Sequence, residues 1–94
     1  MIVSFADRET ENLFFKRAVR RFQPDIVRRA RRKLLQIHAA VVVDDLRMPP
    51  GNRLEALKGS RSGQHSIRVN DQWRICFRFE DGKVYDVEIC DYHK

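Results

Sequence analysis

The chain has 94 residues, which is enough for one domain with a modest hydrophobic core. Nineteen Lys and Arg residues against 13 Asp and Glu residues give a net charge of +6, which favours a polyanionic partner, although a membrane surface or an acidic protein would also satisfy it. No apolar run approaches the ~18 residues that a membrane span needs, and no signal peptide precedes the first charges. We therefore expect a cytoplasmic protein without a membrane anchor.

The cysteines and histidines show no pattern typical of a metal site. His38, His65 and His93 are spread along the chain. In the strand register derived below, Cys90 is the diagonal neighbour of Cys76 at roughly 7 to 8 Å, outside the normal range for a disulfide. We expect free thiols, no metal and no cofactor.

The N-terminal half holds the whole excess of positive charge, since residues 1–40 contain ten Lys and Arg against four Asp and Glu, and residues 41–94 contain nine of each. Ile2 to Phe5 predicts a short strand. Asp7 is a good N-cap for a helix from about Arg8 to Arg21. The apolar stripe expected on that helix consists of Phe14, Phe15, Ala18, Val19 and Phe22.

Pro24 ends the first helix and suits the first turn of a second one, which we expect to run to about His38. Its buried stripe is predicted to be Ile26 or Val27, Ala30, Leu34, Ile37 and Val41. The rest of the helix carries Arg28, Arg29, Arg31, Arg32 and Lys33. This basic face is either an ordinary solvated surface or a docking surface for RNA or for an acidic protein segment.

Four strands are predicted after the helices. Val41 to Leu46 is compatible with a strand or a helical turn, and Met48 to Asn52 reads as a loop. Alternation and turn residues then predict strands at Arg53 to Leu57, Gln64 to Val69, Trp73 to Phe79 and Val84 to Cys90. The expected fold class is α+β, with a short N-terminal strand and two helices packed on a mostly antiparallel, twisted sheet of four to five strands.

The first hairpin has one register that keeps its apolar residues on one face, with Asn70-Asp71-Gln72 as the turn. It pairs Val69 with Trp73, Ile67 with Ile75, and His65 with Phe77. Arg68 then lies opposite Arg74. Like charges in such a pair oppose stability by about 0.2–1 kcal/mol, so a polyanionic partner would explain them.

The second hairpin is expected to turn at Asp81-Gly82-Lys83. Matching apolar faces pairs Phe79 with Tyr85, Phe77 with Val87, and Ile75 with Ile89. Arg78 then faces Asp86 as a neutralised pair. Arg74 faces Cys90, which predicts unpaired positive charge at the end of the sheet where the chain finishes.

The run PPGNRLEALKGSRSGQHSIRVNDQWRICFRF, followed by a strand ending in EICDYHK, resembles the HigB branch of the RelE-like toxins of bacterial toxin-antitoxin modules. The resemblance covers essentially the whole chain. Its most specific parts are Leu57-Lys58-Gly59, the segment from Asn70 to Phe79 with Trp73-Arg74, and the terminal Asp91-Tyr92-His93. The resemblance implies a RelE-like fold and a ribonuclease activity.

The family activity implied is metal-free cleavage of messenger RNA in the ribosomal A site, through attack of a 2′-hydroxyl on the adjacent phosphate. Such a reaction needs a proton acceptor, positive charge on the phosphorane and a proton donor for the leaving oxygen. The catalytic positions carried over are Lys58, Arg74, Asp91, Tyr92 and His93. His93 suits proton transfer at neutral pH, Asp91 would orient it or share the task, and Tyr92 would stack on a base or assist. Lys58 and Arg74 would stabilise phosphate charge.

One position departs from the family. Some relatives have a histidine three residues before the lysine, where this chain has Glu55, so Glu55 is a possible base or a surface carboxylate. The register adds Arg68 to the phosphate-binding residues. The other residues expected to contact RNA are Arg53, Arg61, Gln64, Arg28 and Arg32.

The resemblance also implies partners: a helix-turn-helix antitoxin resembling HigA, the 30S A site with its messenger RNA, and operator DNA only indirectly through the antitoxin. The alternative function is a non-catalytic RNA- or DNA-binding module or a co-repressor. A metal-dependent or thiol-dependent enzyme is disfavoured by the lack of ligand spacing.

Overall fold

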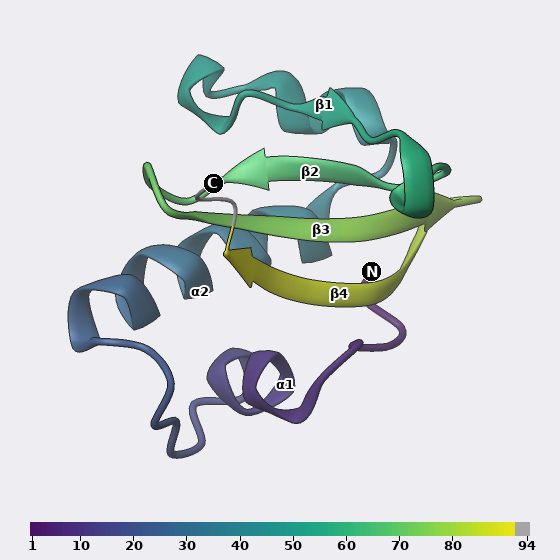
Figure 1. The fold of residues 1–94 in the computed structure, drawn as a ribbon. Helices are drawn as coiled ribbons and strands as arrows, with labels where there is room; N and C mark the ends of the chain where they lie inside the picture. The colour runs from purple at the N-terminus through teal and green to yellow at the C-terminus, as the bar shows by residue number, and fades with distance from the viewer. Residues whose placement is uncertain (92–94) are drawn as a thin grey trace.

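A computed structural model describes residues 1–91 and places two helices against one face of a four-stranded antiparallel sheet (Figure 1). The helices are α1 (Arg8–Phe14) and α2 (Pro24–Ala39). The strands follow one another across the sheet as β1 (Glu55–Ala56), β2 (His65–Arg68), β3 (Trp73–Glu80) and β4 (Lys83–Asp91). Short 3-10 turns lie at Val43–Arg47, Pro50–Asn52 and Gly59–Arg61. The predicted α+β class and its layering are confirmed.

The first hairpin has the predicted register. His65 pairs with Phe77, Ile67 with Ile75, and Arg68 with Arg74. Asn70 builds the turn, because its side-chain oxygen accepts from the backbone N–H groups of Gln72 and Trp73 at 2.9 and 2.8 Å. Period-2 alternation was therefore sufficient to align β2 with β3.

The second hairpin contains a β-bulge that the sequence did not reveal. Ile75 pairs with Ile89 as predicted, but Arg78 pairs with Tyr85 and Phe79 with Val84, so the predicted pairing of Phe79 with Tyr85 is wrong. The extra residue lies on β4, where Asp86 has φ +56°. The predicted contact between Arg78 and Asp86 is nevertheless present at 3.1 Å.

The first helix is half as long as predicted. Asp7 caps it by accepting from the Thr10 N–H at 2.7 Å, but α1 ends at Phe14 and Lys16 adopts φ +60°. Beyond the end, Arg31 of α2 donates to the Phe14 carbonyl at 3.2 Å. The residues of the expected stripe therefore do not share one helix, and Phe15 is 51% exposed. Phe22 is nevertheless buried in the core, and Phe14 and Val19 pack against it.

The second helix agrees with its predicted span. Pro24 is its first residue, and its buried face consists of Ile26, Ala30, Leu34 and Ile37. Val41 lies beyond the helix and is 72% exposed, so its predicted burial is wrong. The segment left undecided by the sequence forms the 3-10 turn Val43–Arg47.

Two predicted strands are shorter in the structure. The segment Ile2 to Phe5 forms isolated parallel bridges to Val84 and Val87 rather than a fifth strand. The predicted strand from Arg53 to Leu57 is reduced to β1, because Arg53 has φ +46° and cannot continue an extended run. No described helix is long and apolar enough to cross a bilayer.

The two faces of the sheet differ in environment. The covered face contributes to one hydrophobic cluster with the helices, including Ile67, Ile75, Phe77, Val87 and Ile89. The opposite face, which we call the open face, is the polar side predicted from the alternation. Its residues include Glu55, Ser66, Arg74, Cys76 and Cys90, which share a side by register.

Candidate functional site

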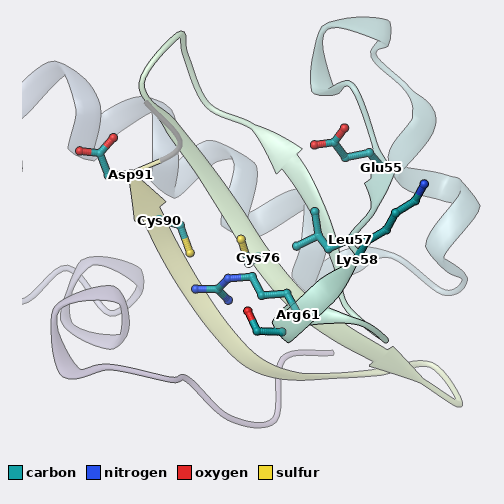
Figure 2. Close-up of a pocket in the computed structure, with 8 residues that line it drawn as sticks. Glu55, Leu57, Lys58, Arg61, Cys76, Cys90 and Asp91 are labelled. Carbon is teal, nitrogen blue, oxygen red and sulfur yellow. The ribbon is translucent and has the colours of Figure 1, made fainter. Parts of the chain in front are cut away.

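A pocket of about 450 Å³ lies on the open face between β1, the turn Gly59–Arg61 and the end of β4 (Figure 2). It combines cationic, carboxylate and thiol groups. Its lining residues are Glu55, Leu57, Lys58, Ser60, Arg61, Cys76, Cys90 and Asp91. Four of these, Glu55, Lys58, Arg61 and Asp91, were predicted from the sequence to act in catalysis or RNA binding, so the fold gathers residues separated by up to 36 positions.

The tight turn after Lys58 brings Arg61 over the sheet. Gly59 opens the turn with φ +67°, a conformation that costs glycine little. The Arg61 guanidinium then donates to Gln64 at 3.0 Å and to Glu88 of β4 at 3.1 Å. These bonds hold Arg61 across the pocket, while Lys58 is exposed at its edge. Gln64, predicted to contact RNA, thus orients Arg61.

Arg74 is buried beside the pocket rather than displayed in it. The residue is 6% exposed, and its guanidinium donates to the Ser66 hydroxyl at 2.8 Å and to the Arg53 carbonyl at 2.6 Å. Glu55 lies 3.7 Å from it. The prediction of unpaired positive charge at this position is wrong, because Arg74 holds β1 and β2 together and sets the position of Glu55.

Arg68 lies opposite Arg74, as predicted, but the pair does not concentrate free charge. Arg68 forms an ion pair with Asp71 in the adjacent turn, and Arg74 points to Ser66 and Glu55. Each arginine therefore has its own acceptors, which removes much of the repulsion that the facing positions implied. Neither residue lines the pocket.

Asp91 is the last described residue and the last residue of β4. It pairs with Trp73 across the ladder, and its carboxylate accepts from the Gln72 side chain at 3.3 Å. It also lines the rim of the pocket, consistent with the prediction that the site extends to the end of the sheet. The predicted catalytic residues Tyr92 and His93 lie outside the described residues.

The remaining residues predicted to bind RNA do not line the pocket. The backbone carbonyl of Arg53 accepts a hydrogen bond from Arg74, and Arg53 is otherwise exposed to solvent. Arg28 and Arg32 lie on α2, on the helical side of the sheet (Figure 1). They border a second hollow, of about 380 Å³, with Lys16, Arg31 and Leu35. Arg61 therefore lines the pocket on the open face, while Arg28 and Arg32 belong to a different basic surface on α2.

The pocket includes residues that the sequence reasoning did not select. Cys76 and Cys90 form part of its wall, Leu57 and Ser60 border it, and Glu88 anchors Arg61. The free thiols were predicted correctly. The predicted register had already placed both cysteines on the polar face beside Arg74, and that placement was the available signal. Among residues 1–91, no cluster of three or more His, Cys, Asp or Glu side chains could hold a metal ion.

Sequence comparison agrees with this architecture. The family model described as the RelE-like toxin of the type II toxin-antitoxin system HigB matches residues 3–93. The chain belongs to the HigB-like toxin family. It is thus the toxin of a type II toxin-antitoxin system, as the resemblance of its motifs predicted.

Individual relatives of this HigB-like toxin extend over its full length. It is 39% identical over 95 residues to Toxin HigB-1 of Vibrio cholerae serotype O1, covering 100% of this chain and 99% of that protein. It is 34% identical over 93 residues to Endoribonuclease HigB of Proteus vulgaris, covering 99% and 100%. A solved YoeB-YefM complex from Staphylococcus aureus is similar in fold, with a TM-score of 0.64 at 20% identity over 100% of this chain and 97% of that one.

Proposed function

We propose that this HigB-like toxin is an endoribonuclease that cleaves messenger RNA on the ribosome through attack of a 2′-hydroxyl on the neighbouring phosphate. The observation that carries the proposal is the pocket on the open face, where the cations Lys58 and Arg61 share one hollow with the carboxylates Glu55 and Asp91. Cations favour the charge that develops on a phosphorane, and carboxylates can accept or orient a proton. The name of the Proteus vulgaris relative, an endoribonuclease, supports the same activity.

Each group has a role that its environment supports. Lys58 is exposed at the edge and would contact a non-bridging phosphate oxygen, and the fixed Arg61 would neutralise the opposite side. Asp91 would orient His93, which follows it by two positions and would transfer the proton. Tyr92 would stack on a base or assist that transfer. Arg74 is a positioning residue in this proposal, since its buried guanidinium holds Glu55 at 3.7 Å.

Glu55 is the proposed base at the position where some relatives have a histidine. Its side chain is 46% exposed and lines the pocket, so a substrate hydroxyl could reach it. The Arg74 guanidinium, 3.7 Å away, holds the carboxylate on its other side. Both features support a catalytic assignment for Glu55 over that of a surface carboxylate.

The ribosome is the proposed source of substrate alignment. The pocket is exposed at Lys58 and Asp91, so the protein alone supplies few groups to fix a flexible RNA in an in-line geometry. Holding the reacting atoms in place contributes a large part of many rate enhancements. We therefore expect weak cutting of free RNA and efficient cutting in the A site of a translating 30S subunit, which also places the activity in the cytoplasm.

The proposed protein partner is a helix-turn-helix antitoxin similar to HigA, which would neutralise the toxin and connect it to operator DNA. Membership of a toxin-antitoxin family and the toxin-antitoxin complexes among similar structures support an antitoxin partner. The unpaired cations of α2 provide one surface with charge complementary to an acidic segment of such a partner.

A translating extract tests the enzymatic proposal. Primer extension on a reporter message should reveal cuts with 5′-hydroxyl and 2′,3′-cyclic phosphate ends. Substitutions Lys58→Ala, Asp91→Asn and His93→Ala should each lower the cutting rate by about 10²–10⁴. The matched control is Lys83→Ala, because Lys83 is the exposed first residue of β4 and does not line the pocket.

The competing non-catalytic function makes the opposite prediction. If the protein only binds nucleic acid or acts as a co-repressor, the chain produced without its antitoxin should bind nucleic acid tightly, in a salt-sensitive way, and should cause no growth arrest. Full arrest by a folded Lys58→Ala or His93→Ala variant, without cut messages, would refute the endoribonuclease.

A further inference from the structure

A buried asparagine, Asn52, joins the helical layer to the segment that leads into β1. It has no exposed surface. Its side-chain oxygen accepts from the Nζ of Lys33 on α2, and its side-chain nitrogen donates to the Gln36 side chain of the same helix at 3.2 Å. The same nitrogen donates to the carbonyls of Leu46 and Met48 at 3.1 and 3.2 Å. Asn52 therefore fastens the irregular segment before β1 to α2.

The residue that follows Asn52 reaches the candidate catalytic pocket. Arg53 lies in the left-handed region with φ +46°, and its N–H donates to the Pro50 carbonyl at 3.1 Å. The Arg53 carbonyl in turn accepts from the Arg74 guanidinium at 2.6 Å. That guanidinium also lies 3.7 Å from the Glu55 carboxylate. Contacts thus run without a gap from α2 through Asn52 to a carboxylate of the pocket.

The strand that carries this carboxylate has few contacts of its own. β1 contains only Glu55 and Ala56, which are both exposed and pair with β2 at the edge of the sheet. Lys58 follows two residues later and lines the same pocket (Figure 2). Segments with few buried apolar contacts open at low cost in free energy. The positions of Glu55 and Lys58 therefore depend on the residues that anchor the chain before β1.

Lys33 differs from the other cations of α2. It is half-buried and bonded to Asn52, whereas Arg28, Arg29 and Arg32 are exposed. Burial, followed by the charges of Arg32 and Arg29, lowers the pKa of Lys33 below its ordinary value. Lys33 is thus a link between α2 and the segment before β1 rather than a member of the solvated basic face.

We propose that Asn52 is a positioning residue for Glu55 and Lys58, and that Lys33 is the anchor that holds Asn52 in place. The inference rests on the proposed ribonuclease activity of the pocket and deepens it. Misplacement of a reacting group by about 1 Å can cost on the order of 10²-fold in rate. Loosening Asn52 should therefore slow the chemical step and leave binding to the ribosome unchanged.

Single-turnover cleavage on programmed ribosomes separates the chemical step from binding. Lys33→Met removes the donor to Asn52 but keeps an unbranched apolar side chain. It should lower the cleavage rate at saturating toxin about tenfold and leave the half-saturating toxin concentration unchanged. Lys83→Met removes the same charge at an exposed lysine that does not line the pocket, and it should change neither quantity.

The opposite pattern would overturn the proposal. A raised half-saturating concentration with an unchanged saturated rate in Lys33→Met would show that Lys33 is an ordinary docking cation. This variant also leaves the Asn52 side chain in place, so it keeps the proposal testable if substitution of Asn52 itself prevents folding.

Substitutions of Asn52 test the amide directly. Asn52→Asp keeps an acceptor for Lys33 but loses the donors to the Leu46 and Met48 carbonyls, and Asn52→Ala loses both kinds of contact. Both should lower the saturated rate, and Asn52→Ala should lower it more. Leu13→Ala, at a buried core position of α1, controls for lost stability and should cleave at the parent rate while folded. Equal loss of rate in Leu13→Ala and Asn52→Ala would refute a positioning role.

Amide hydrogen exchange measures the anchoring without RNA. In Lys33→Met, the N–H groups of Arg53 and Leu57, which donate to Pro50 and Gln64 at 3.1 and 2.8 Å, should exchange several-fold faster, while the amides of β3 keep their protection. Unchanged exchange at these two amides, with normal cleavage by the parent chain, would refute the anchor alone. Faster exchange in a chain whose parent form cuts no message would instead refute the ribonuclease activity on which the positioning role rests.

Discussion

The open face of the sheet and the outer face of α2 are both rich in arginine, but they differ in whether carboxylates lie beside the arginines. Each arginine on the open face lies beside a carboxylate; the pairs are Arg61 with Glu88, Arg68 with Asp71, Arg74 with Glu55, and Arg78 with Asp86. Within residues 1–91, no ion pair forms at the basic residues of α2, which are Arg28, Arg29, Arg31, Arg32 and Lys33.

The difference separates two uses of positive charge. A paired guanidinium is fixed in direction, so it can position a carboxylate or face one point of a substrate. Exposed cations without a carboxylate partner, such as Arg28, Arg29 and Arg32, create a field that attracts any polyanion and weakens with salt. The net charge of the chain does not distinguish these uses, whereas the location of the carboxylates does.

Removing Arg74 should give the largest effect on stability. Arg74→Ala deletes donors to the Ser66 hydroxyl and the Arg53 carbonyl, and buried acceptors left without partners cost about 1–3 kcal/mol each. Urea denaturation should show that loss in the free energy of unfolding. Arg32→Ala on α2 is the matched control and should stay within about 0.5 kcal/mol. Equal losses of unfolding free energy in Arg74→Ala and Arg32→Ala would show that the arginines of the two surfaces do not differ in their contribution to stability.

Removing positive charge from α2 should give the second-largest effect, a weaker salt dependence of polyanion binding. The double substitution Arg28→Gln and Arg32→Gln should flatten the dependence of log affinity on log salt for single-stranded RNA by about 0.7 for each lost phosphate contact. The control is Arg78→Gln on the open face, whose guanidinium already lies 3.1 Å from Asp86. Fluorescence anisotropy across a salt series measures both slopes. A larger reduction of the salt slope in Arg78→Gln than in the α2 double variant would show that the open face, not α2, supplies the main contacts to the polyanion.

Breaking the pair between Arg61 and Glu88 should cost less. Both side chains are about one-third exposed, and partly exposed ion pairs contribute about 0.2–1 kcal/mol. Glu88→Gln should therefore lower the free energy of unfolding within that range, while the release of Arg61 should lower cleavage in the translating extract more noticeably. A variant that loses stability but cleaves at the normal rate would show that Arg61 need not be fixed.

Asp45 should give the smallest change, and one that depends on pH. Its carboxylate accepts from the backbone N–H groups of Val41 and Val42 at 2.9 and 3.2 Å, and these bonds hold its pKa below the ordinary value. A carboxyl with a depressed folded pKa stabilises above its unfolded pKa of about 3.9 and loses that contribution as pH falls through the folded pKa.

Thermal melts of Asp45→Asn at several pH values check this expectation. The variant should melt slightly below the parent chain at pH 7, and the difference should vanish once the parent carboxyl is protonated. Asp44→Asn is the control, because Asp44 accepts from the Arg47 side chain rather than from backbone groups. A difference in melting temperature that persists unchanged in acid would show that the effect of Asp45→Asn does not come from loss of the carboxylate charge.

Much of the sheet could be predicted because its information is local. Apolar alternation aligned β2 with β3, and turn residues located both hairpins. The pocket residues Lys58 and Asp91 followed from motif resemblance. The bulge at Asp86 could not be predicted, since a single residue in the left-handed region leaves no periodic signal. The early end of α1 depends in a similar way on a contact with distant Arg31.

The sequence by itself determined which strand residues share a face, where α2 begins, and to which toxin family the chain belongs. The tertiary structure alone decided that Arg74 is buried and that Arg28 and Arg32 lie away from the pocket. The physical reason is the separation in sequence of the interacting residues, because strand alternation and helix capping depend on residues that are near neighbours in the chain. Burial of a guanidinium, by contrast, depends on a carbonyl 21 residues away, and a pocket wall depends on strands that meet only after folding.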